Sequence, residues 1–148
     1  MKFRRILVGI NSINESKEVA DQAIAIAKNF RSELHAITVF DIPDIYTSKI
    51  NPGKLSHHLL KERLEKMENR LLEIKQDAVR EELSIVTELI DENTRPEKSL
   101  LTYCKNKNID LIIVGKGKGK GENFKEWMLG STALEIAKYA DCNVMIIK

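Results

Sequence analysis

Residues 110–132 read DLIIVGKGKGKGENFKEWMLGST, an apolar run followed by alternating glycine and lysine and then by a new apolar segment. Leu111–Val114 is short and β-branched, which predicts a buried strand. Four of the chain's seven glycines follow it before residue 122. Gly130-Ser131-Thr132 predicts the start of a helix. A strand that leads through a glycine-rich loop into a helix is typical of α/β proteins.

The rest of the chain repeats this alternation of strand and helix. Apolar runs of strand length occupy Arg5–Ile10, Leu34–Phe40, Ser84–Ile90 and Val144–Ile147. Helical periodicity occupies Asn14–Phe30, Leu55–Arg80, a segment from Pro96 to the stop at Lys105–Asn108, and a segment from Gly130 onward. Strands that alternate with helices predict an α/β fold with a parallel sheet covered on both faces.

Finer features of the helices follow from the same patterns. The apolar stripes include Phe30 on the first helix and Leu59, Leu72 and Val79 on the second, so we expect these side chains to face inward. Two capping boxes are predicted. One is Thr94-Arg95-Pro96-Glu97, with proline in the first turn, and the other pairs Thr132 with Glu135.

Length and composition exclude several classes of protein. The 148 residues fit one domain, residues 1–148. No apolar run approaches the ~20 residues of a membrane helix, and the start lacks a signal peptide, so we expect a cytoplasmic protein without a membrane partner. The two cysteines have no metal-like spacing and predict buried small apolar side chains. His35 lies in a predicted strand and is expected to be packed.

The charge gathers in the glycine loop. The net charge is +2, and residues 115–130 carry four lysines against two glutamates, so the remainder is neutral. A neutral remainder argues against a nucleic-acid partner. Glycines let backbone N–H groups approach an anion, and the following helix N-terminus adds partial positive charge and free donors. The alternative is a solvated loop that binds nothing.

Two known phosphate motifs do not fit this loop. The dinucleotide fingerprint follows the first strand of its unit, whereas these glycines follow the fourth predicted strand. The Walker A pattern requires Gly-Lys followed by Ser or Thr, and no Gly-Lys pair here is followed by a hydroxyl residue. Zinc and serine-hydrolase patterns are absent from the sequence as well.

The whole chain resembles the universal stress protein family. Five segments carry the resemblance in order: residues 6–12, 32–39, 110–115, 124–131 and 140–147. The resemblance implies a Rossmann-like sheet of five strands in the order 3-2-1-4-5. It also implies a homodimer that pairs through Val144–Ile147.

The family's ATP-binding members carry G-x2-G-x9-G-[ST] after the fourth strand and an acidic residue after the first. Counted back from Gly130, the first two positions are Gly117 and Lys120. Counted forward from the strand, they are Gly115 and Lys118. The resemblance implies that ATP or a related adenine nucleotide contacts Asn11 near the nucleoside, Val39 at the adenine, and a phosphate set: Gly115, Gly117, Lys118, Lys120, Gly121, Gly130, Ser131 and Thr132.

Three functions remain open on the sequence. The first is a dimeric stress-response module whose occupancy by nucleotide changes its choice of protein partner. The second is a dimer of the same family that binds no nucleotide and uses the lysine loop on an acidic protein. The third is a slow ATPase, for which Asp41 and Glu126 are the available but unspecific carboxylates. The sequence carries no recognisable set of catalytic residues or metal ligands.

Overall fold

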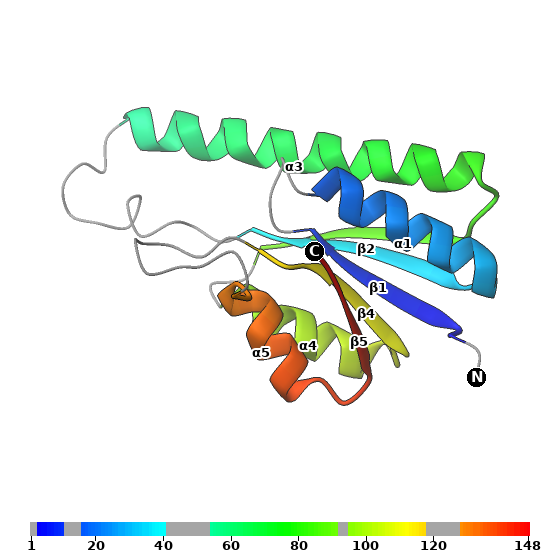
Figure 1. Ribbon diagram of the computed structural model, residues 1–148. Helices are drawn as coiled ribbons and strands as arrows, with labels where there is room; N and C mark the ends of the chain where they lie inside the picture. Colours follow the sequence, from blue (N-terminus) through cyan, green and yellow to red (C-terminus); the bar gives the residue numbers. More distant parts are fainter. Residues whose placement is uncertain (1–2, 11–15, 41–53, 92–94, 118–127) are drawn as a thin grey trace.

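The computed structural model describes residues 3–10, 16–40, 54–91, 95–117 and 128–148. The elements, labelled as in Figure 1, are β1 (Arg5–Ile10), α1 (Ser16–Phe30), β2 (Glu33–Val39), α3 (Lys54–Arg80), β3 (Ile85–Ile90), α4 (Pro96–Asn106), β4 (Leu111–Gly115), α5 (Ser131–Tyr139) and β5 (Asn143–Ile147). The sequence predicts their bounds to within two residues, except the end of α5, for which it predicts no residue. Among the described residues, no helix has both the length and the apolar character needed to cross a bilayer.

The five strands form one parallel sheet in the order β3-β2-β1-β4-β5, which confirms the order that the resemblance implied. The register is continuous through the middle of the sheet, where Val8 lies beside Ala36 on one side and Ile113 on the other. Every residue from Ile6 to Ile10 is buried. A central strand without polar alternation is expected in a sheet covered on both faces.

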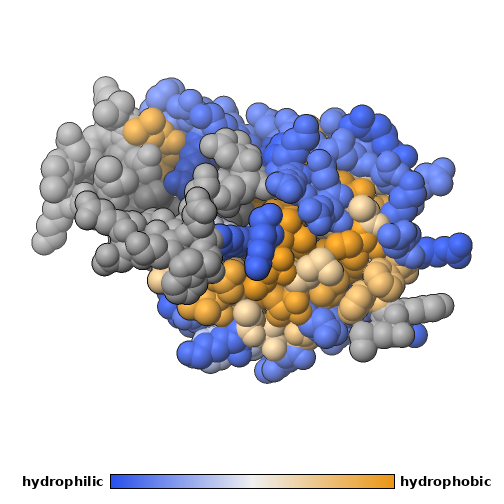
Figure 2. Space-filling model, viewed as in Figure 1, coloured by the Kyte–Doolittle hydropathy of each residue, from blue (hydrophilic) through white to orange (hydrophobic). Residues whose placement is uncertain are grey.

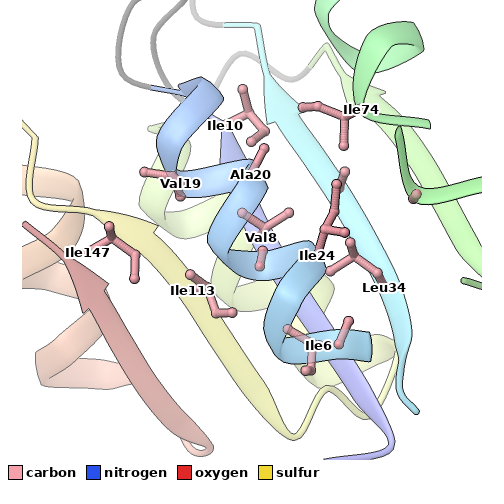
Figure 3. Packing of buried hydrophobic residues seen from close by; sticks show 14 of the residues in the cluster. Ile6, Val8, Ile10, Val19, Ala20, Ile24, Leu34, Ile74, Ile113 and Ile147 are labelled. Atoms are coloured by element: carbon pink, nitrogen blue, oxygen red, sulfur yellow. The ribbon is translucent and has the colours of Figure 1, made fainter. Parts of the chain in front are cut away.

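Two pairs of helices cover the sheet, α1 and α3 on one face and α4 and α5 on the other (Figure 1). On the first face, the side chains of Ile6, Val8 and Ile10 point toward α1, where Ala20 and Ile24 meet them (Figure 3). The second face packs alternate strand residues against α4 and α5. The two apolar clusters hold the sheet between its two layers of helices.

The predicted inward stripes are wrong at four positions. Phe30 is 41% exposed, and Leu59, Leu72 and Val79 are 39%, 53% and 58% exposed. Phe30 ends α1 and packs edge-on against the Phe3 ring, 4.9 Å between centroids, instead of entering the core. On α3, Leu72 and Val79 lie one residue, and so about 100°, beyond the inward row. That row consists of Met67, Leu71, Ile74 and Ala78.

Both predicted capping boxes are also wrong. The N-cap of α4 is Arg95, and it forms no side-chain capping bond. Pro96 occupies the first helical position, where a fixed φ and a missing N–H are tolerated, and this moves the cap to the residue before it. The N-cap of α5 is Gly130, whose carbonyl accepts from Leu134 N at 3.0 Å. Thr132 therefore lies inside the helix.

Candidate functional site

The candidate site lies at the edge of the sheet where the parallel strands end. The carboxyl ends of β1, β2 and β4 and the N-terminus of α5 meet there (Figure 1). In open parallel sheets, ligands bind outside this edge where the strand order reverses. Here the order reverses at β1, which has β2 on one side and β4 on the other. The fold therefore places the end of β4 and the start of α5 beside the expected ligand position.

Two glycines of the predicted set touch each other across the glycine–lysine loop. Gly117 has a φ of +77°, which side-chain-bearing residues rarely adopt. A Cβ on Gly117 would lie 3.3 Å from Gly130 Cα, and a Cβ on Gly130 would lie 3.2 Å from Gly117 Cα. Gly115, by contrast, is the last residue of β4 and pairs with Ile147. The turn thus falls at Gly117, the position reached by counting back from Gly130.

The backbone of Lys116 holds this glycine contact in place. Its N–H donates to Ile147 O at 2.7 Å, which extends the pairing of β4 with β5 by one residue. Its carbonyl accepts from Gly130 N at 2.8 Å. One peptide segment therefore ties the end of the sheet to the start of α5. A side chain added at Gly117 or Gly130 would push the two backbones apart and disturb the hydrogen bonds that Lys116 makes.

The N-terminus of α5 is open toward a ligand. Gly130 has no side chain that could cap the helix, and Leu134 makes the first bond of the helix to it. The N–H groups that precede Leu134 therefore lack an acceptor within the helix. Ser131 is exposed and Thr132 half-buried, so two hydroxyl residues lie beside these donors. The N-terminus of α5 thus combines backbone N–H donors with the partial positive charge of the helix dipole, an arrangement that favours an anion.

Val39 lies at the end of β2 on the same face of the sheet as α5. Its side chain is 5% exposed and belongs to the apolar cluster that contains Val114 and Ala133. Beyond it, Phe40 N donates to Ile90 O at 2.8 Å and continues the β2–β3 pairing. The described part of the predicted set thus comes together at one edge: Val39, Gly115, Gly117, Gly130, Ser131 and Thr132. The predicted site residues Asn11, Lys118, Lys120 and Gly121 lie outside the described residues.

The same edge holds a buried carboxylate that the sequence did not single out as a site residue. Glu97 lies in the first turn of α4 and is 6% exposed. Its Oε1 is 3.3 Å from Arg95 Nε. Sequence reasoning placed Glu97 in a capping box, which explains its type but not its burial. The edge therefore offers a hydrogen-bond acceptor as well as the amide donors of α5.

His35 is packed, as expected, and lies toward the opposite edge of the sheet. It is 4% exposed, and its ring nitrogens contact Tyr103 Oη at 2.7 Å and Glu33 Oε1 at 2.6 Å. Burial, with smaller contributions from Glu88 and Glu33, raises the pKa of Tyr103 to about 12. Tyr103 therefore stays protonated and its hydroxyl remains available to the imidazole. This cluster serves the packing of α4 on β2.

These features define a Rossmann-like α/β protein with a glycine turn and a helix N-terminus at the carboxyl edge of its sheet. The model of the universal stress protein family matches residues 2–148. The chain belongs to this family. It is 28% identical over 149 residues to the universal stress protein YxiE of Bacillus subtilis (strain 168), covering 99% of each chain.

Solved structures of the family share the fold. The universal stress protein UspA from Lactobacillus plantarum superposes with a TM-score of 0.79 at 24% identity, over 100% of this chain and 99% of that chain. A universal stress protein from Archaeoglobus fulgidus in complex with dAMP gives 0.69 at 14% identity, over 100% of both chains. Another universal stress protein, in complex with cAMP, gives 0.68 at 18% identity, over 99% and 98%.

Proposed function

We propose that this chain is a stress-response module that binds ATP or a related adenine nucleotide and acts as a homodimer. One observation carries the nucleotide part of the proposal. Gly117, in the left-handed region, packs directly against Gly130, the N-cap of α5. A strand end, a glycine turn and a helix start without a side-chain cap are thereby held together at the carboxyl edge of the sheet.

The chemistry of this edge supports a phosphate group as the ligand. Backbone N–H groups at the start of α5 supply donors without a side-chain competitor. The half-exposed Lys116 adds a positive charge near them. The complexes of two structural neighbours with cAMP and dAMP support an adenine nucleotide over other phosphates. Occupancy of the site would change the surface that the chain presents to its protein partner.

The dimer part of the proposal rests on β5, an edge strand without charged residues. Its residues Val144, Met145 and Ile146 are only half-buried. Figure 2 shows apolar side chains gathered on the face where β5 runs, between α1 and α5. The other edge strand, β3, includes Glu88, an exposed charge of the kind that discourages strand pairing. A second copy of β5 is the occupant that fits an unpaired, apolar edge.

Calorimetry tests the nucleotide proposal. ATP, AMP and cAMP are titrated separately into the purified protein, and mass spectrometry identifies any ligand released by denaturation. We expect at least one adenine nucleotide to bind, and inorganic phosphate alone to bind more weakly. Absence of released nucleotide together with no binding heat at millimolar ATP would contradict the proposal and favour the nucleotide-free dimer.

Sedimentation velocity tests the dimer proposal. Met145→Arg places a charge in the middle of β5, so we expect the variant to sediment as a monomer. Leu72→Arg is the matched control, because Leu72 is already 53% exposed on α3. Circular dichroism establishes that both variants fold. A wild-type monomer at all concentrations, or a folded Met145→Arg dimer, would refute pairing through β5.

A further inference from the structure

The fold brings together two cysteines that lie far apart in the sequence. Cys104 is in the C-terminal half of α4 and is 8% exposed, and Cys142 immediately precedes β5 and is half-buried. Both belong to the apolar packing beneath α4 and α5. Both also line one open pocket with a volume of about 400 Å³. A small reagent from solution can therefore reach a site that holds both sulfur atoms.

The two thiols interact directly and are not equivalent. The two side chains lie within hydrogen-bonding reach of each other, so each thiol affects the pKa of the other. Burial, with smaller contributions from Cys142, raises the pKa of Cys104 to about 12. Burial also raises the pKa of Cys142, and the carboxyl groups of Asp110 and Asp141 add to this, whereas hydrogen bonding acts in the opposite direction. Cys142 is the more exposed of the two thiols, so a reagent that enters the pocket meets it first.

A metal ion is a poorer explanation for this pair. Structural sites for zinc require four ligands, and catalytic sites require three from the protein. In the part of the chain that the structure describes, no group of three or more His, Cys, Asp or Glu side chains is arranged to hold a metal. The two thiols act on each other and line the same pocket, which fits a dithiol better than a metal site.

We propose that Cys104 and Cys142 form a reversible intramolecular disulfide when the protein meets a peroxide. The Cys142 thiolate attacks one peroxide oxygen and breaks the O–O bond. This leaves a sulfenic acid on Cys142 and releases the other oxygen, which takes up a proton to become water. The Cys104 sulfur then loses its proton and attacks the sulfenic sulfur, and a second water leaves as the S–S bond forms. Two thiols lose two electrons, and one peroxide gains them.

The bond would tie α4 to β5 around the part of the chain that matters for the proposed function. The segment between the cysteines contains β4, both contacting glycines and α5. The disulfide itself lies before β5 begins and so at the end of the sheet opposite the glycine contact. It therefore restrains the segment without occupying the candidate nucleotide site. The disulfide does not depend on the proposed nucleotide binding, and its test measures thiols alone.

The test uses the full-length wild-type protein, reduced, freed of reductant and then treated with hydrogen peroxide. Remaining thiols are blocked with N-ethylmaleimide during denaturation, and the intact mass is measured. We expect N-ethylmaleimide to label neither cysteine, and the monomer mass to lie about 2 Da below that of the unlabelled reduced chain, because two hydrogens are lost. Dithiothreitol should restore both thiols. The oxidised chain should unfold at a higher urea concentration, because the bond closes a loop in the unfolded chain.

Single variants assign the two roles. In Cys104→Ser, the Cys142 sulfenic acid has no resolving thiol and should be trapped by dimedone. In Cys142→Ser, we expect dimedone labelling of Cys104 to be at least about tenfold slower, because its side chain is buried and harder for the peroxide to reach. Two intact thiols after peroxide treatment would overturn the proposal. Disulfide-linked dimers, or oxygen added without loss of hydrogen, in the wild type would overturn it as well.

Discussion

Replacing Gly117 with alanine tests the glycine contact most sharply. At φ +77° an L-residue is strained by roughly 1–2 kcal/mol. The added Cβ would also lie 3.3 Å from Gly130 Cα, so backbone atoms would have to shift by a few tenths of an ångström. We expect Gly117→Ala to lower the free energy of unfolding by about 1–2 kcal/mol. If nucleotide binding requires the same closed turn, ATP affinity falls by roughly 5–30-fold.

Three matched variants separate the contributions in this experiment. Gly117→Asn keeps the added Cβ but tolerates positive φ, so it should lose less stability than Gly117→Ala. Gly130→Ala adds no strain at φ −64° but places its Cβ 3.2 Å from Gly117 Cα. Gly115→Ala is the control, because its Cβ would meet only a Val19 methyl group at 3.1 Å and no backbone of the loop.

Urea unfolding and calorimetry with ATP measure the two quantities for each variant. We expect the affinity loss to follow Gly117 and Gly130 and to spare Gly115. If Gly117→Ala is as stable as the wild type, the positive φ is not a feature of the folded chain. If Gly115→Ala weakens ATP binding as much as Gly117→Ala does, the closed turn is not what the nucleotide requires.

Three further predictions concern the packing around the site. Tyr103→Phe should cost about 1–3 kcal/mol in urea unfolding, because it leaves the buried Nδ1 of His35 without its partner, and an unchanged midpoint would contradict this. Leu71→Ala should cost about 2–5 kcal/mol, whereas Leu72→Ala should stay within about 0.5 kcal/mol, and equal losses would refute the assigned inward face. Burial raises the pKa of Cys104 to about 12, above the value near 8.5 of an unfolded cysteine. The protonated thiol therefore contributes fully to stability below about pH 8.5, and this contribution is lost as the pH rises toward 12. Urea unfolding should show a lower free energy of unfolding at about pH 10.5 than at about pH 8, and Cys104→Ala should make this difference smaller.

The helices and strands of this fold can be predicted from the sequence, because the strands of a sheet buried on both faces are continuous apolar runs. Runs such as Leu111–Val114 are apolar throughout, and the helices between them have a clear period. The sequence predicts too wide an inward stripe on α3, because the apolar residues of this helix occupy more than one face and only contact with β2 and β3 selects the inward row. The cap of α4 was misplaced because Pro96 and Glu97 suit either of two adjacent starts.

The sequence predicts only part of the candidate site. Residue types indicated a glycine loop, but two registers, Gly115 and Gly117, fitted the spacing equally well. The choice between them depends on φ and on the approach of Gly130, which are properties of the closed chain. No local sequence pattern predicts that Cys104 and Cys142 lie close together. It arises because α4 and β5 become neighbours only through the order of strands in the sheet.

The most direct test of the central claim is an amide NMR titration of the wild-type protein with ATP. If the nucleotide binds where the glycine turn meets α5, the largest chemical-shift changes will fall on the backbone amides of Gly117, Gly130, Ser131 and Thr132, with smaller changes at Val39. Inorganic phosphate at the same concentration should move the amides near α5 but leave Val39 unchanged. Binding at the glycine turn is contradicted if ATP leaves these amide shifts unchanged, or if the changes centre on the pocket lined by Cys104 and Cys142 instead.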